Sequence, residues 1–95
     1  MASVKMIKKD IDYLVGEVVA DCYMTIYFHP AKKNEVISVM EQAVELRNKL
    51  FAAANNPAEK NNSSLVRKHY AAIRRELLEK IDELFVSLSD ICKKK

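Results

Sequence analysis

Chain-breaking residues are scarce in this sequence, and their scarcity constrains the fold more than any other feature. The 95 residues include one glycine and two prolines, the residue types that most often mark turns. Few turns require long regular segments, and the many Leu, Ala, Glu and Lys residues favour helices over strands. The sequence therefore predicts an all-α fold, built as a single small domain over residues 1–95.

Apolar residues recur at spacings of three and four along most of the chain, which is typical of helices with one buried face. His29-Pro30 interrupts this pattern, because a residue before proline is disfavoured in the helical region. The polar stretch 56–63 interrupts it again and predicts a loop. Three long helices are therefore expected, and residues 1–3 and 93–95 are expected to fray. The predicted helix bounds are about 4–28, 31–55 and 64–92.

Short connections between long helices force neighbours to run antiparallel, so the predicted architecture is an up-down-up bundle. Ser63 or Ser64 is expected to cap the third helix. The apolar stripe of that helix keeps close to heptad spacing, and Leu78, Phe85 and Cys92 widen it. A stripe of this width is expected to face two neighbouring helices rather than one coiled-coil partner.

Two cysteines, Cys22 and Cys92, are too few for a disulfide framework or a metal-ligand pattern. The third helix is the longest, and we expect it to overhang the His29-Pro30 end. That register would separate the cysteines by roughly 15 Å along the axis, whereas a disulfide needs Cα atoms within about 7 Å. Acidic residues interrupt the apolar stretch 13–28, so neither a secretory signal nor a membrane span is expected. These features favour a soluble, cytoplasmic chain.

The stretch 13–28 is apolar on nearly every side of its predicted helix. The side opposite the expected core carries tyrosines and a methionine around two small residues, and such patches are seldom left bare. We expect this side to be the interface of a two-fold homodimer. The alternatives are a tyrosine-rich exposed face, or a face covered by the loop or by the end of the third helix. The predicted interface residues are Tyr13, Gly16, Ala20, Tyr23, Met24 and Tyr27.

Three arginines interrupt the apolar pattern. Arg47 is expected in the middle of the apolar face of the second helix, and Arg67 and Arg74 are expected on the flank of the core face of the third. The antiparallel arrangement places Arg47, Arg74 and Asp12 at about the same height. An inward charge needs a partner, so one interpretation is a set of ion pairs that fixes the register of the helices. The candidate partners are Asp10, Asp12 and Glu45. The other interpretation is a small anion pocket lined by the three arginines and Tyr70.

Catalytic and metal-binding patterns are not found. Neither His29 nor His69 has a glutamate three residues before it, as the helical di-iron sites require. Glu76, Glu79 and Asp82 overlap in one segment and resemble a solvated, ion-paired helix face. With a single glycine, no phosphate-cradling loop is expected. The sequence therefore predicts no enzymatic activity, no cofactor and no metal.

Basic residues are expected to gather at the end of the bundle where the first helix begins, although the net charge is only +3. Such an end can attract phosphate or nucleic acid, but acidic residues share the region. No motif in the chain is specific enough to indicate a family. The favoured interpretation is a non-catalytic protein–protein interaction or adaptor module that self-associates through its first helix. The alternative is a nucleic-acid or phosphate-ligand binder that uses the basic end.

Overall fold

A computed structural model describes residues 4–56 and 62–93. Most of the ends predicted to fray (1–3 and 94–95) and most of the predicted loop (57–61) lie outside the described residues. Lys93, also predicted to fray, is helical. The described residues form three long helices, one short 3₁₀ turn and no strand, which confirms the all-α prediction. The elements are α1 (Val4–Phe28), η1 (Pro30–Lys32), α2 (Lys33–Asn55) and α3 (Ser63–Lys93).

The start of α3 is set by an asparagine that the sequence argument did not select. The side-chain oxygen Oδ1 of Asn62 accepts hydrogen bonds from the backbone N–H groups of Ser64, at 3.1 Å, and Leu65, at 3.2 Å. Asparagine is among the best N-cap residues, because its short side chain reaches the unpaired amides of the first turn. The prediction that Ser63 or Ser64 caps this helix is therefore wrong.

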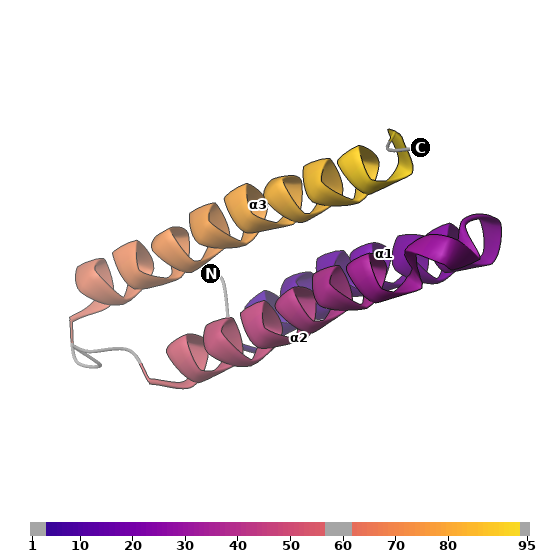
Figure 1. Cartoon of the computed structure of the whole chain (residues 1–95). Coiled ribbons are helices and arrows are strands. Elements are labelled where there is room, and N and C mark those ends of the chain that lie inside the picture. Colours follow the sequence, from indigo (N-terminus) through magenta and orange to yellow (C-terminus); the bar gives the residue numbers. More distant parts are fainter. Residues whose placement is uncertain (1–3, 57–61, 94–95) are drawn as a thin grey trace.

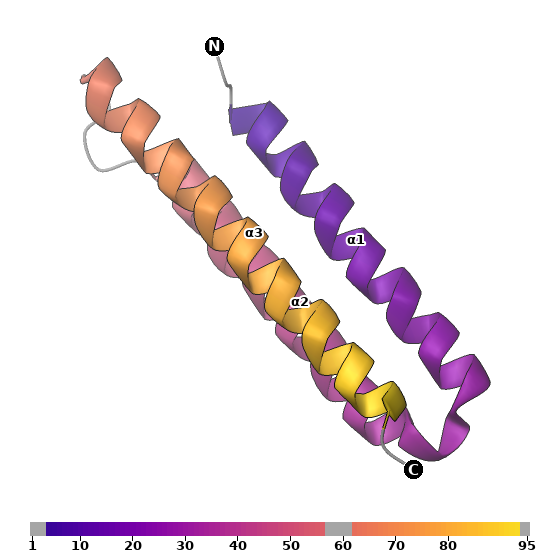
Figure 2. The same ribbon diagram turned by 90° about the horizontal axis from the view of Figure 1, so that it is seen from above.

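The three helices lie side by side in a molecule with principal extents of 53 × 18 × 17 Å (Figures 1 and 2). Each long helix packs against the other two. The buried face of α1 is the predicted one, with Ile7, Ile11, Val18 and Cys22 fully buried. Burial of such side chains contributes roughly 1.5–3 kcal/mol each, and it is the main stabilising term for a bundle of this kind.

The orientation of α2 differs from the one that the sequence suggested. Val39 and Leu46 are buried, at 3% and 8% exposure, whereas Met40 is half-buried and the Arg47 side chain is 38% exposed. Placing Arg47 in the middle of the apolar face was therefore wrong. Both rows of residues have the same three-and-four spacing, but the observed rotation buries apolar side chains and avoids the cost of burying a charge.

The register of α3 also differs from expectation. The thiol Sγ of Cys92 lies 4.0 Å from Oγ1 of Thr25, and the ammonium group of Lys32 contacts the backbone oxygen of Ile91. The end of α3 is thus level with the α1–α2 junction and does not overhang it, while the first turns of α3 extend past the opposite end (Figure 2). Cys92 is therefore only about 4.5 Å along the axis from Cys22. Both thiols are free, one buried and the other exposed.

Candidate functional site

The side of α1 that faces away from the core is exposed and carries large apolar side chains. Gly16 and Ala20 are exposed on the same side. The exposed fractions of the large residues are 68% for Tyr13, 62% for Tyr23, 56% for Met24 and 77% for Tyr27. The structure therefore brings the six residues of the predicted interface onto one outer surface. We call this surface the tyrosine face.

Gly16 is open to solvent and is not closely packed against the described part of its own chain. A Cβ atom built at this position meets nothing within 4 Å. A glycine inside a helix destabilises it by up to about 1 kcal/mol relative to alanine. No close contact within the described chain offsets that cost, so the tyrosine face contains a small, open position at its centre.

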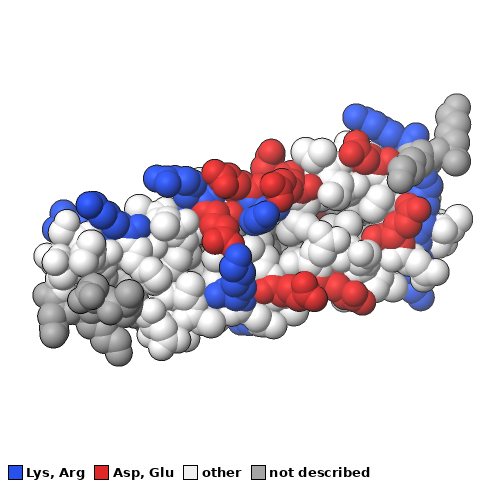
Figure 3. Space-filling model, turned by 60° about the vertical axis from the view of Figure 1, so that its left-hand side comes forward, with Lys and Arg blue, Asp and Glu red and all other residues white. Residues whose placement is uncertain are grey.

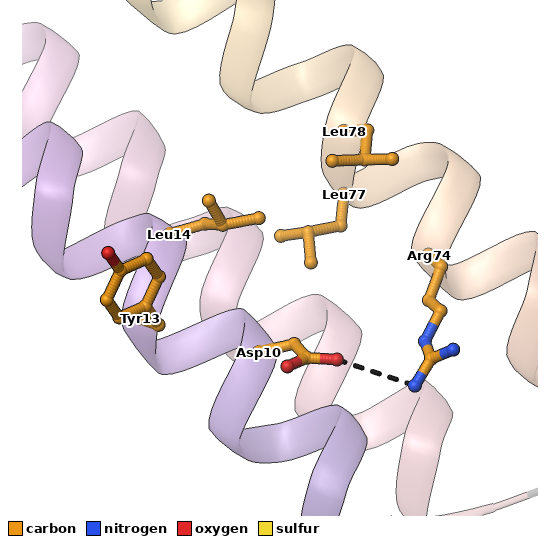
Figure 4. Close-up of a pocket in the computed structure, with 6 residues that line it drawn as sticks. All are labelled: Asp10, Tyr13, Leu14, Arg74, Leu77 and Leu78. Carbon is orange, nitrogen blue, oxygen red and sulfur yellow. Dashed lines mark hydrogen bonds and ion pairs between the residues drawn. The ribbon is translucent and has the colours of Figure 1, made fainter. Parts of the chain in front are cut away.

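A second apolar surface, which the sequence argument missed, lies between α1 and α3. A groove of about 400 Å³ opens there, lined by Tyr13, Leu14, Leu77 and Leu78 together with one ion pair (Figure 4). The ion pair joins Asp10 Oδ2 to Arg74 Nη2 at 3.4 Å. Figure 4 shows Leu14 and Leu77 pointing toward one another, with the Asp10–Arg74 ion pair beside them.

The signal for this groove was present in the heptad pattern of α3. Leu78, Phe85 and Cys92 were expected to face a neighbouring helix. Instead Leu78 is 61% exposed, Phe85 is half-buried and Cys92 is exposed. The widened side of the stripe is turned toward α1, as the Cys92–Thr25 contact shows, but α1 does not cover it fully.

The arginines predicted to form an ion-pair or anion-binding cluster lie apart in their contacts. Arg47 Nε donates to Asp12 Oδ1 at 2.6 Å, and Arg74 pairs with Asp10. Arg67 is exposed and has no ion-pair partner within residues 4–56 and 62–93. Two of the three arginines therefore bind different aspartates of α1.

The ring of Phe51 contacts two basic side chains, one of them that of Arg47. The Arg47 guanidinium lies 4.1 Å from the centre of the Phe51 ring, and the Lys8 ammonium lies 5.6 Å from the same ring. Such cation–π contacts contribute about 0.5–1 kcal/mol at exposed sites. Tyr70, which was considered for the anion pocket, is half-buried with its ring 5.7 Å from that of His69.

Charged side chains are mixed in sign. Figure 3 shows basic and acidic side chains interspersed over the visible face, with uncharged stretches between them. Lys49 Nζ also lies 2.6 Å from Glu76 Oε2. Binding of a phosphate backbone requires a concentration of unpaired positive charge, which these ion pairs reduce.

The thiol of Cys22 is buried in the core. Burial in the core, and secondarily the charge of Asp21, raises the pKa of the Cys22 thiol from 9.0 to about 11. Such a thiol stays protonated near neutral pH, whereas thiol nucleophiles act as thiolates. Within the described parts of the chain, no three His, Cys, Asp or Glu side chains are grouped as metal ligands. No helix there has the length and apolar character that crossing a membrane requires.

The sequence matches no family model, and neither the curated proteins nor the solved structures give a match. The tyrosine face and the α1–α3 groove are therefore the features from which a function can be argued.

Proposed function

We propose that this protein is a non-catalytic interaction module that forms a two-fold homodimer through the tyrosine face. The tyrosine face itself carries this proposal, because its four large side chains are each more than half exposed around Gly16 and Ala20. Tyrosine and methionine are enriched in protein interfaces. Rigid tyrosine rings also bury a large area at a low cost in conformational entropy.

The two small residues support a close contact between helices. Gly16 and Ala20 are four residues apart, so they lie one above the other on the same side of α1. The open space at Gly16 would admit a side chain of a second α1. A two-fold contact of this kind uses each residue twice, once from each copy.

We infer that the protomer is an antiparallel up-down-up bundle. In that arrangement the apolar surface of the tyrosine face extends from α1 onto α2. The Asp12–Arg47 contact supports this arrangement, because it joins the first half of α1 to the second half of α2. In an antiparallel pair, Gly16, one turn after Asp12, is level with Val44, about one turn before Arg47. Val44 is 47% exposed. It shares a shallow groove, lined mainly by apolar side chains, with Ile37, Met40, Glu41 and Glu45.

This extension matters because stable interfaces bury about 800 Å² on each partner. The tyrosine face, from residue 13 to residue 27, is about 21 Å long at 1.5 Å per residue. One helix of this length offers a narrow strip, and the exposed apolar side chains of α2 widen it. We therefore place α1 at the centre of the proposed interface and α2 at its edge.

Light scattering coupled to gel filtration tests the proposal. We expect the wild-type protein to have twice the 10.9 kDa chain mass. We expect Ala20→Glu to be a monomer, because the interface would bury an unpaired charge. Ala72→Glu, at an exposed alanine of α3, is the matched control and should remain dimeric. A wild-type monomer at the highest attainable concentration would refute the dimer. A dimer unaffected by Ala20→Glu would refute the tyrosine face as its interface.

The alternative of a nucleic-acid or phosphate binder has less support. Arg47, Lys49 and Arg74 at the basic end are each paired with an acidic side chain. Binding of phosphate would have to compete with these contacts.

A further inference from the structure

The groove between α1 and α3 is an apolar surface separate from the tyrosine face, although Tyr13 borders both. Its volume is about 400 Å³, and three of its six lining residues are leucines: Leu14, Leu77 and Leu78. Leu77 is buried at its floor, whereas Leu78 is 61% exposed at its rim. The groove is thus open to an apolar side chain from outside the protomer.

The groove is part of a longer line of contact between α1 and α3, which we call the seam and which continues along most of the bundle. It runs from the Asp10–Arg74 ion pair to the Thr25–Cys92 contact near the other end. Between these contacts, the half-buried Phe85 follows Leu78 at a spacing of seven residues. Seven residues are two helical turns, so the same side of α3 presents an apolar residue at regular intervals, as helices do where another helix packs against them.

Acidic side chains flank this seam on both helices. Glu17 follows Asp10 by seven residues on α1 and Asp21 follows it by eleven, so both lie on the side of α1 that reaches α3. On α3, Asp82 follows Leu78 by four residues. All three carboxylates are exposed, and none has a basic partner among the described side chains. A partner would bind this seam most tightly if it presented an apolar stripe with positive charges along its edges.

We propose that this seam binds a basic amphipathic helix of a partner protein, which would complete a four-helix arrangement. A second copy of this chain suits it poorly. The tyrosine face, an apolar face that a second copy offers, is bordered by the same Asp10 and Glu17, so like charges would meet. The proposed partner helix carries apolar residues at heptad spacing and flanking lysines or arginines.

Two designed, fluorescently labelled helical peptides test the proposal by fluorescence anisotropy. Both have about three heptads with leucine at two positions of each; one has lysines at the flanking positions and the other has glutamates. We expect the lysine peptide to bind the wild-type protein at least about tenfold more tightly than the glutamate peptide does. Its affinity should fall as added salt screens the charges. Equal affinities, or no binding of the lysine peptide, would overturn the proposal.

Substitutions locate the binding surface. Leu78→Glu, at an exposed position, should lower the affinity for the lysine peptide at least about tenfold, since it puts a charge on the apolar contact. Ala72→Glu, at an exposed alanine of α3 that belongs to neither surface, should leave this binding unchanged. The double variant Glu17→Lys/Asp21→Lys should bind the glutamate peptide more tightly than the lysine peptide, a reversal that unfolding cannot produce. Unchanged binding by Leu78→Glu would overturn the proposal. Conversion of a homodimer to a monomer by Leu78→Glu would overturn it too, because a second copy would then occupy the groove.

Discussion

The ammonium group of Lys32, in the turn between α1 and α2, lies 2.7 Å from the backbone carbonyl oxygen of Ile91, in the last turns of α3. Carbonyl groups at a helix C-terminus have no partner within the helix, and the helix dipole favours a positive charge there. This one contact joins residues 59 positions apart in the sequence. It holds the α1–α2 junction against the end of α3.

Replacing Lys32 by methionine should therefore lower the free energy of unfolding by about 1 kcal/mol, because the hydrogen bond is lost while much of the apolar stem is kept. Urea denaturation monitored by circular dichroism measures the change. Lys33→Met is the matched control, since Lys33 is exposed and adjacent. Equal effects of the two substitutions would show that the contact with Ile91 contributes nothing of its own.

A double-mutant cycle should detect the ion pair between Arg47 and Asp12. Their side chains are 38% and 53% exposed, so we expect a coupling free energy of about 0.5 kcal/mol between Arg47→Met and Asp12→Asn. Molar salt should reduce it. Arg47→Met should cost more than Asp12→Asn, because it also removes the contact with Phe51. A coupling that is insensitive to salt would contradict an electrostatic origin.

Gly16→Ala should affect the protomer and the proposed dimer in opposite directions. The added methyl group meets nothing within 4 Å in the protomer, so alanine should raise the free energy of unfolding by up to about 1 kcal/mol. In the proposed interface the same methyl group would push two helices apart and raise the dimer dissociation constant. Unfolding at low protein concentration measures the first effect, and sedimentation equilibrium the second. A tighter dimer would argue against close helix approach at Gly16.

Cys22 should make the protein lose stability in alkaline solution. Its thiol pKa is about 11 in the folded protein, against 9.0 for an ordinary thiol. Between these pH values the unfolded chain releases the proton and the folded chain keeps it, so the free energy of unfolding falls as pH rises from 9 to 11. The full loss, reached above pH 11, is roughly 3 kcal/mol. Cys22→Ala should show a smaller fall over that range in denaturation curves; an identical fall would assign the whole effect to other groups.

Much of this fold could be predicted from local sequence signals. The end of α1 follows from Pro30, because the constraint that proline places on the preceding residue is local. The limits of α2 and α3 also fell within about two residues of those predicted. The buried side of α3 could be predicted for a similar reason, since the spacing of its apolar residues leaves one choice of inward side.

Relations between helices were harder to predict. On α2, the rows through Val39 and Leu46 and through Met40 and Arg47 have equal spacing, so the spacing alone does not decide between them. The height of Cys92 depends on how α3 slides along the other helices, which no local pattern determines. For the tyrosine face, the sequence predicted which residues share a surface. The α1–α3 groove was missed because it depends on how closely two helices approach.

Cys92 has a practical consequence for studying this protein. It is exposed, while the other thiol is buried and protonated near neutral pH. Maleimide dyes react with accessible thiolates, so they should attach at one position without any engineering of the chain. A dye there sits on the seam between α1 and α3, beside Thr25. The native sequence thus supplies a spectroscopic reporter for whatever comes to lie along that seam.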